Sequence, residues 1–257
     1  MSDSLRGKTA VITGSGRGIG KGIALALAAQ GCNIAINFFR RRQNAEETAR
    51  EIEALGVRTA LIKANVGVEE DVRRLVDASA EQLGSVDIFV GNAASGVQRA
   101  ATEITAKAWD WTLNINARSI LFGVQAAAPY MQRNGWGRII TISSIGSRRV
   151  LPEYSVVGVS KAAIEAVTRY LAIELAPLGI IANCISPGIV MTEALDHFPR
   201  GEEMIRSAQS ATPVGRLVTP ADVGALAVWL CSDAAGMIVG QTIELDGGHS
   251  LLMSGQI

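Results

Sequence analysis

Short apolar runs alternate with longer mixed segments along the whole chain. The apolar runs predict seven strands, over residues 9–13, 33–37, 57–63, 86–91, 138–143, 180–185 and 242–245. The segments between them predict helices, over residues 19–30, 45–55, 69–83, 105–133, 158–178 and 219–231. Several runs are apolar throughout, as in strands that helices cover on both sides. The pattern therefore predicts one α/β domain over residues 1–257, built on a doubly wound parallel sheet.

Residues 193–213 interrupt this alternation. They mix polar and apolar residues between the sixth strand and the last helix, without the pattern of either element. Long segments of this kind in compact domains are typical of functional loops. We therefore expect residues 193–213 to form a substrate lid.

Composition narrows the class of protein. Of the 257 residues, 48% are apolar and 19% are charged, which excludes a disordered chain. A chain of this length buries about three-quarters of its unfolded surface, so its core needs no disulfide or metal. The 24 basic residues balance the 24 acidic ones, so no bulk charge draws the protein to nucleic acid or to an anionic membrane.

Cysteine and histidine usage argues against disulfides and metal sites. The three cysteines are widely spaced without a CxxC pair, and His197 and His249 lack ligand spacing. Residues 1–8 are polar and contain no apolar signal segment, and no run reaches 18 apolar residues. We therefore expect a soluble protein of a reducing cytoplasm, without a metal site.

A glycine-rich turn follows the first predicted strand and opens the first helix, with the sequence TGSGRGIG over residues 13–20. Glycines let the backbone turn tightly and approach a pyrophosphate, and a helix amino terminus offers free N–H groups and a positive dipole end. A glycine cluster can also be an ordinary loop, but its place between strand and helix favours dinucleotide binding. The predicted contact residues are Gly14, Ser15, Arg17, Gly18, Ile19 and Gly20.

The charges after the second strand predict which dinucleotide binds. An NAD-selecting site carries an acid about 20 residues beyond the glycine turn, but residues 4–45 contain no Asp or Glu. Arg40, Arg41 and Arg42 stand there instead, and a guanidinium holds the 2′-phosphate that a carboxylate would repel. The sequence therefore predicts NADP(H), with Arg17, Arg40 and Arg41 as contacts. For Arg41 and Arg42 a solvated turn is the alternative.

In these and later segments the chain resembles the short-chain dehydrogenase/reductase family. The shared motifs, in the family's order, are TGxxxGxG at residues 13–20, Asn-Ala-Ala for Asn-Ala-Gly at 92–94, Ser-Ser at 143–144, Ser-Lys-Ala at 160–162, PGxxxT at 187–192 and Asp-Gly-Gly at 246–248. Each motif is common, but together and in order they are highly specific. The resemblance implies a Rossmann-type fold, a nicotinamide-dependent oxidoreductase and assembly as a homotetramer.

The resemblance also implies roles for single residues. It assigns cofactor contacts to Asn65, Val66, Asn92, Ala93, Ala94, Lys161, Pro187, Gly188, Ile189 and Thr192. Asn65-Val66 departs from the family's Asp-Val, although asparagine still offers a hydrogen bond there. Catalytic roles fall to Asn116, Ser144 and Lys161. The alternative for Ser144 is a plain strand end, and for Asn116 it is a structural contact that kinks its helix.

The catalytic tyrosine departs from the family's Tyr-x3-Lys, because the residue four before Lys161 is Val157, which offers no acid. The nearest tyrosine, Tyr154, gives Tyr-x6-Lys. Seven residues turn a helix through about 700°, so Tyr154 and Lys161 share a face if the helix extends that far, about 10 Å apart along its axis. We predict that the Tyr154 phenol points into the redox pocket. An ordinary half-exposed tyrosine is the alternative.

Tyr-x6-Lys resembles the enoyl-[acyl-carrier-protein] reductases, and this chain is most similar to their type III branch. The resemblance implies NADPH-dependent reduction of the double bond of a trans-2-enoyl thioester, on acyl carrier protein or coenzyme A, by hydride transfer to the β-carbon. Tyr154 would stabilise the enolate. Pro187 follows the wider family, which keeps a reductase of 3-oxoacyl thioesters or other carbonyls as an alternative. A non-catalytic NADP-binding protein is the alternative of another class.

Four arginines near the expected active-site mouth form a candidate basic rim, namely Arg148, Arg149, Arg200 and Arg206. Such a rim would receive the phosphate of phosphopantetheine or an acidic carrier protein. Scattered, solvated charges are the alternative.

Overall fold

Seven strands pair in parallel as one sheet, in the order β3-β2-β1-β4-β5-β6-β7. The computed structural model describes residues 5–192 and 201–252. The strands are β1 Thr9–Ile12, β2 Asn33–Phe38, β3 Thr59–Lys63, β4 Ile88–Gly91, β5 Gly137–Ile142, β6 Ile180–Pro187 and β7 Thr242–Leu245. Each predicted strand is present, and no predicted end is off by more than two residues. The doubly wound parallel α/β fold is confirmed.

Helices join successive strands. They are α1 Gly18–Ala28, α2 Arg42–Glu53, α3 Glu69–Leu83, α4 Ala106–Leu113, α5 Ser119–Arg133, α6 Ser155–Leu175, α7 Gly201–Ser210 and α8 Pro220–Cys231. The start of α8 is a capping box, because the Thr219 hydroxyl accepts from the Asp222 N–H while the Asp222 carboxylate accepts from the Thr219 N–H. The prediction of a helix start at Thr219 is therefore confirmed.

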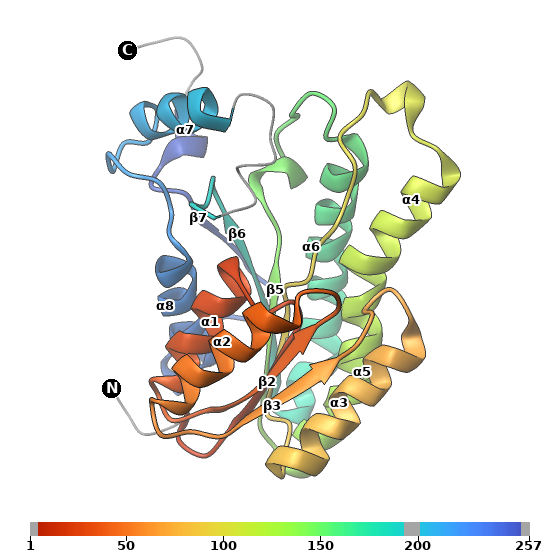
Figure 1. Cartoon of the computed structure of the whole chain (residues 1–257), viewed down its shortest axis with the longest axis vertical. Coiled ribbons are helices and arrows are strands. Elements are labelled where there is room, and N and C mark those ends of the chain that lie inside the picture. The colour runs from red at the N-terminus through yellow and green to blue at the C-terminus, as the bar shows by residue number, and fades with distance from the viewer. Residues whose placement is uncertain (1–4, 193–200, 253–257) are drawn as a thin grey trace.

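The helices cover both faces of the sheet (Figure 1). Successive strand residues point to opposite faces, so Ile12 of β1 packs in the core beneath α1 and α8, whereas Val11 packs beneath α3 and α5. Both side chains are fully buried. Burying each aliphatic side chain of this size contributes about 1.5–3 kcal/mol, which explains why the strands are apolar on both sides.

The predicted helix over residues 105–133 is wrong in one respect, because a π-helical turn at Asn114–Arg118 separates α4 from α5. A π turn accommodates one extra residue without breaking the run of apolar positions, so the sequence pattern does not reveal it. The predicted helix over 158–178 also begins earlier, at Ser155, and its last turn, Ala176–Leu178, is a 3₁₀ helix. The π turn and the earlier start of α6 lie toward the carboxyl ends of the strands, where the candidate site is, whereas the 3₁₀ turn lies at the opposite edge of the sheet.

The predicted lid over residues 193–213 is only partly within the described residues. Residues 193–200 lie outside them, and α7 accounts for ten of the others. Figure 1 shows α7 beyond the carboxyl ends of β6 and β7. The lid therefore stays a prediction. In the described part of the chain, no helix has the length and apolar character needed to cross a membrane.

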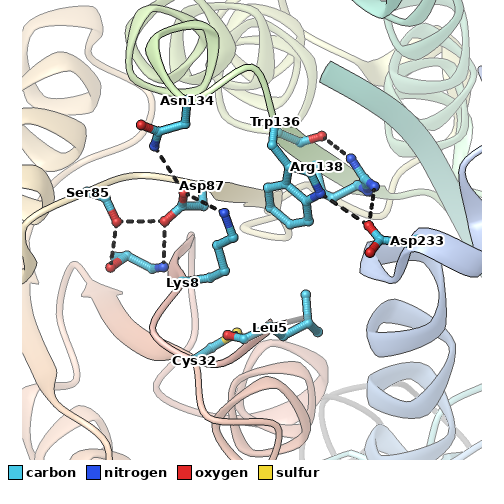
Figure 2. Close-up of polar contacts among 11 residues, drawn as sticks. Leu5, Lys8, Cys32, Ser85, Asp87, Asn134, Trp136, Arg138 and Asp233 are labelled. Carbon is cyan, nitrogen blue, oxygen red and sulfur yellow. Dashed lines mark hydrogen bonds and ion pairs between the residues drawn. The ribbon is translucent and has the colours of Figure 1, made fainter. Parts of the chain in front are cut away.

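Asp87 joins several segments at the amino-terminal edge of the sheet (Figure 2). Its buried carboxylate accepts hydrogen bonds from the Thr9 N–H (2.9 Å), the Ser85 hydroxyl (2.6 Å) and the Asn134 amide (3.3 Å). The Lys8 ammonium lies 3.5 Å from the same carboxylate. These contacts fix the starts of β1 and β4 at the edge opposite to the candidate site.

Candidate active site

A cleft of about 700 Å³ opens at the carboxyl ends of β1, β2 and β4. The strand order reverses at this point, because β1 is flanked by β2 and β4. Ligands of doubly wound sheets bind at such a switch point. The glycine turn and the segments after β2 and β4 line the cleft.

The glycine turn has the geometry predicted for a pyrophosphate site. Gly14 and Gly18 have φ angles of +65° and +56°, which favour glycine, and α1 begins at Gly18. A Cβ atom at Gly20 would lie 2.5 Å from the Asn92 amide nitrogen, so the helix start packs directly on the segment after β4. The first N–H groups of α1 therefore face the cleft, where an anion is stabilised.

Ser15 does not line the cleft, contrary to its predicted role as a cofactor contact. Its side chain is buried behind the turn, where the hydroxyl donates to the Ile12 carbonyl (2.8 Å) and accepts from the Asn37 N–H (3.2 Å). The Asn37 side-chain oxygen in turn accepts from the Gly14 N–H (3.1 Å). The Ser15 and Asn37 side chains therefore hold the shape of the turn.

The segment after β2 fits the 2′-phosphate of NADP(H). Arg40 and Arg41 line the cleft, and the Arg40 guanidinium lies 5.5 Å from the centre of the Phe39 ring. Among the described residues, no carboxylate lines this cleft. Arg42 instead pairs with Glu46 one turn along α2, at 2.7 Å, and is not among the residues that line the cleft. With Arg17 also at the cleft, the residues fit NADP(H).

The other predicted cofactor contacts divide into two groups. The residues that line the cleft are Asn65, Val66, Asn92, Ala93, Ala94 and Thr192, together with Ile19 and Gly20. Thr192 closes over the turn, since a Cβ atom at Gly18 would lie 3.6 Å from its methyl carbon. Pro187 and Gly188 do not line the cleft, and Ile189 lines a separate small cavity beside Asp246. The N–H of Gly188 is bound to the Leu245 carbonyl (3.0 Å).

Lys161 lies on α6 beside the end of β5. Its side chain is 6% exposed, and its ammonium group donates to the Ile142 carbonyl (2.8 Å). Burial disfavours the charged form and lowers the pKa of Lys161 to about 8. The lysine is thus an ammonium group at neutral pH in a poorly solvated place, one strand over from the segment after β4 that lines the cleft.

Tyr154 and Ser144 lie together at the end of β5. The Tyr154 ring packs on Gly146, because a Cβ atom there would lie 2.7 Å from the ring and 3.5 Å from the Ser144 hydroxyl. Burial raises the pKa of the Tyr154 phenol, and the nearby Ser144 hydroxyl acts in the opposite direction. The Ser144 Oγ is shielded from solvent and, among the described residues, has no hydrogen-bonding partner. An unpartnered hydroxyl would suit a group that binds a substrate oxygen. Ser144, Tyr154 and Lys161 are not among the residues that line the cleft, so the prediction that the Tyr154 phenol points into the redox pocket stays a prediction.

The route by which Tyr154 reaches this place differs from the prediction. The residue is the N-cap of α6 and lies outside the helix, so a shared helical face does not set its position. Glu153 before it has φ of +61°, and its carbonyl accepts from the Arg99 N–H (3.0 Å). This left-handed residue turns the chain so that the Tyr154 ring folds back onto Gly146.

Val157, at the family's usual tyrosine position, packs against the segment after β4. A Cβ atom at Gly96 would lie 2.2 Å from one of its methyl groups, and Val157 itself is buried. Val157 therefore fills apolar space and supplies no proton donor. Of the two positions, only Tyr154 carries a hydroxyl, and its ring lies against Gly146 on the same turn as Ser144.

Asn116 lies in the π turn and is fully buried. Its side-chain oxygen accepts from the Ser95 N–H (2.8 Å), and its amide donates to the Ser160 hydroxyl (2.8 Å). It therefore ties the wall of the cleft to α6 next to Lys161. These contacts match the structural alternative, in which Asn116 positions other groups.

The two described arginines of the candidate basic rim are exposed, and both have partners within the chain. Arg148 pairs with Glu244 (2.7 Å) and with Glu165 (3.5 Å), and Arg149 donates to the Ser250 carbonyl (2.6 Å). Arg200 lies outside the described residues, and the side chain of Arg206 is not described either. Arg148 and Arg149 instead bind the active-site turn to the carboxy-terminal segment.

The cleft also has lining residues that the sequence did not predict, namely Gly16, Asn37, Phe38, Phe39, Asn44, Ala64, Ser95, Trp111 and Ile115. Asn37 and Ser95 follow the rule that ligands bind at the carboxyl ends of strands, so their places near the ends of β2 and β4 were a usable signal. Trp111 is on α4, and no local motif marks it.

Known proteins support the interpretation of this fold and cleft. The family model described as "Enoyl-(Acyl carrier protein) reductase" matches residues 14–250. Two relatives are each 35% identical: 1-cyclohexenylcarbonyl-CoA reductase of Streptomyces collinus, covering 96% of this chain and 88% of the relative, and hydroxynaphthalene reductase-like protein Arp2 of Metarhizium anisopliae, covering 95% and 96%. The chain therefore belongs to the short-chain dehydrogenase/reductase family and is an oxidoreductase.

Solved structures agree with this assignment. A putative short-chain alcohol dehydrogenase from Sinorhizobium meliloti superposes with a TM-score of 0.92 at 34% identity, covering 96% of this chain and 98% of that one. A short-chain dehydrogenase from Burkholderia cenocepacia in complex with NADP gives 0.88 at 33% identity, covering 96% and 99%.

Proposed function

We propose that the protein reduces the carbon–carbon double bond of a trans-2-enoyl thioester with NADPH. The observation that carries this proposal is that the tyrosine stands at position 154, while valine occupies position 157, where the family usually has its tyrosine. Val157 offers no proton donor, whereas Tyr154 brings a phenol to Ser144 from the amino-terminal end of α6. This placement differs from that of carbonyl reductases of the family, and the sequence shares it with enoyl reductases.

NADPH, when bound, supplies the hydride that the reduction consumes. Negative charge then develops on the thioester oxygen of the substrate, which becomes an enolate, and uptake of a proton from solvent at the α-carbon completes the reduction. The Tyr154 hydroxyl donates a hydrogen bond to that oxygen, and the Ser144 hydroxyl stands beside it. Lys161 contributes positive charge below pH of about 8. Donors aimed at a developing oxyanion in a site shielded from water stabilise the transition state by about 3–4 kcal/mol each.

The relatives support a reductase, but their names point to different substrates. The Streptomyces collinus relative is named for 1-cyclohexenylcarbonyl-CoA, a thioester conjugated to a double bond, whereas the Metarhizium relative is named for a hydroxynaphthalene, and both are 35% identical. A carbonyl reductase therefore stays the second candidate. The NADP complex of the Burkholderia neighbour supports the cofactor.

The proposal extends to the carrier and the assembly. The reacting atoms are the same on coenzyme A and on acyl carrier protein, so either thioester fits, and a role in fatty-acid synthesis follows if the carrier is the protein. We also propose a homotetramer. The exposed apolar side chains of Tyr170 and Ile173 on α6, 73% and 71% exposed, are suited to a contact between subunits.

The direct test is NADPH oxidation with crotonyl-CoA and with acetoacetyl-CoA at equal concentrations. We expect turnover of crotonyl-CoA and none of acetoacetyl-CoA above background. Turnover of acetoacetyl-CoA alone would make the protein a carbonyl reductase. Tight NADPH binding without turnover of either thioester, or of other enoyl and keto substrates, would favour a non-catalytic NADP-binding protein.

A further inference from the structure

Glu165 is a buried carboxylate that the mechanism above does not use. It lies on α6 one turn after Lys161 and is 6% exposed. Its Oε1 atom accepts hydrogen bonds from the Ser143 hydroxyl (2.8 Å) and the Ser147 hydroxyl (2.5 Å). A buried carboxylate with two hydroxyl donors is strongly fixed in place, because a charged acceptor makes the stronger kind of hydrogen bond.

The two serines stand at either end of the turn that follows β5. The turn runs from Ser143 to Ser147 and includes the 3₁₀ helix Ile145–Ser147. The Ser147 N–H donates to the Ser144 carbonyl (3.0 Å) within it. Because one oxygen of Glu165 holds both serine side chains, it fixes both ends of this turn to α6. The position of the turn relative to α6 therefore depends on Glu165.

Tyr154 rests on the same turn. Its ring contacts Gly146, in the middle of the turn, so closely that a Cβ atom at Gly146 would lie 2.7 Å from it. The Gly146 carbonyl also lies against α6, since a Cβ atom at Gly158 would be 2.7 Å from it. If the turn shifted, the Tyr154 ring would move with it or lose its contact with Gly146.

The charge of Glu165 is balanced from outside the turn. The Nε atom of Arg148 lies 3.5 Å from the second oxygen of Glu165, and the same guanidinium bonds to Glu244 at 2.7 Å. Arg148 follows the turn directly, so this contact restrains the turn on its far side as well. A buried carboxylate of this kind is tolerated because it is paired and hydrogen-bonded.

We propose that Glu165 is a positioning residue for the reaction: through Ser143 and Ser147 it holds the turn on which the Tyr154 phenol rests. This inference rests on the proposed function, because it assigns the phenol its catalytic task. It also predicts that the hydrogen bonds matter more than the charge, since the turn is held by the oxygen that both serines share.

Glu165→Ala and Glu165→Gln test the idea together, with Glu174→Gln on the exposed side of the same helix as the control. In Glu165→Ala, we expect kcat with crotonyl-CoA to fall roughly 10- to 100-fold, because small misplacements of a reacting group cost this much. The Kd for NADPH should change less than about threefold, since Glu165 is not among the residues that line the cleft. Glu165→Gln keeps an oxygen that both hydroxyls can reach and should restore most of kcat.

Coupling to Tyr154 separates positioning from general support of the fold. In a Tyr154→Phe background, Glu165→Ala should reduce kcat no further, because residues that act as a unit are not additive. Full multiplication of the two losses, or an unchanged kcat in Glu165→Ala alone, would overturn the inference. If Glu165→Ala does not fold, Ser147→Ala removes one of the two hydrogen bonds without touching α6 and must show the same coupling. Near-native turnover in Tyr154→Phe alone would instead refute the proposed function.

Discussion

The ammonium group of Lys161 lies where its charge is poorly solvated. Burial lowers its pKa to about 8, so the group is charged below that pH and neutral above it. The pKa of Tyr154 is raised from its ordinary value, and the phenol keeps its proton across this range. If the positive charge of Lys161 assists the phenol, kcat/KM should be level below pH 8 and fall as pH rises above it, because kcat/KM reports the free enzyme.

The pH profile of kcat/KM between pH 6 and about 10 checks this prediction. Lys161→Met should lose most activity and the alkaline fall with it. Lys107→Met, at an exposed position on α4, should keep the profile of the natural protein. A profile that stays level through pH 10 would show that the charge of Lys161 is not needed.

Arg40 and Arg42 offer a matched pair for the choice of cofactor. Arg40 lines the cleft, whereas Arg42 is paired with Glu46. Because a hydrogen bond to a charged group contributes about 1.5–3 kcal/mol, Arg40→Ala should weaken NADPH binding roughly 10- to 100-fold. NADH, which lacks the 2′-phosphate, should bind as before. Titration of NADPH fluorescence measures both constants, and an equal loss in Arg42→Ala would contradict the assignment.

At the scale of residues, the motifs predicted the backbone conformation of the glycine turn but not the hydrogen-bonding partners of its side chains. The positive φ angles of Gly14 and Gly18 follow from their place between strand and helix. The Ser15 side chain, in the same motif, points inward, where its hydroxyl accepts a hydrogen bond from the Asn37 N–H in β2. No local pattern carries that contact, since the two residues are 22 positions apart.

The turn before α6 is the element on which the proposal depends. Glu153, with φ of +61°, is the one non-glycine residue of the described chain in the left-handed region. Such a conformation costs about 1 kcal/mol or more for a residue with a Cβ atom. Glu153→Gly should therefore raise the free energy of unfolding by up to about 1 kcal/mol, or Tm by roughly 2–4 °C.

Calorimetry or urea unfolding checks the effect of Glu153→Gly. The matched control is Glu81→Gly at an exposed position in the last turn of α3, where glycine should lower stability by up to about 1 kcal/mol. Opposite signs in the two variants would support a strained turn before Tyr154. Loss of stability in both would contradict it.

Some element boundaries were predictable because a local signal marks them, whereas the predicted helices over 19–30 and 45–55 end two residues earlier in the structure. The capping box at Thr219 and the glycine after α3 are such signals, and both ends agree with the structure. The π turn at Asn114–Arg118 was not predictable, because what holds it includes the bonds of Asn116 to Ser95 and Ser160, which are 21 and 44 residues away. Tertiary contacts decide such distortions.

The two edges of the sheet have separate tasks. The carboxyl edge carries the cleft, Ser144 and Tyr154, while the amino edge carries Asp87 and its partners (Figure 2). Removing a buried, paired carboxylate leaves its donors unsatisfied, so Asp87→Ala should lower the free energy of unfolding by roughly 3 kcal/mol. The kcat of the folded fraction should stay unchanged, because the reaction takes place at the other edge.

Urea unfolding and kcat, measured on the same preparations, check this separation of tasks. Glu81→Ala, at an exposed position of α3, is the control and should change stability by less than about 0.5 kcal/mol. A large fall in kcat in folded Asp87→Ala would show that the amino edge takes part in the site after all.

At the scale of the whole molecule, the sequence predicted the layers because helices on both faces require apolar strands. It did not predict that the carboxy-terminal segment binds the active-site turn. From the sequence, Arg148 and Arg149 were predicted to belong to a basic rim at the surface. In the folded chain they contact Glu244 and Ser250 instead. Contacts between residues about 100 positions apart leave no local signal.

Turnover of crotonyl-CoA by Tyr154→Phe tests the central claim most directly, with Tyr170→Phe at an exposed position of α6 as the control. If the phenol is the oxyanion donor that replaces the missing group at Val157, Tyr154→Phe should lower kcat by roughly a hundredfold or more and leave NADPH binding intact. Tyr170→Phe should match the natural protein. Equal turnover in both variants would contradict the account.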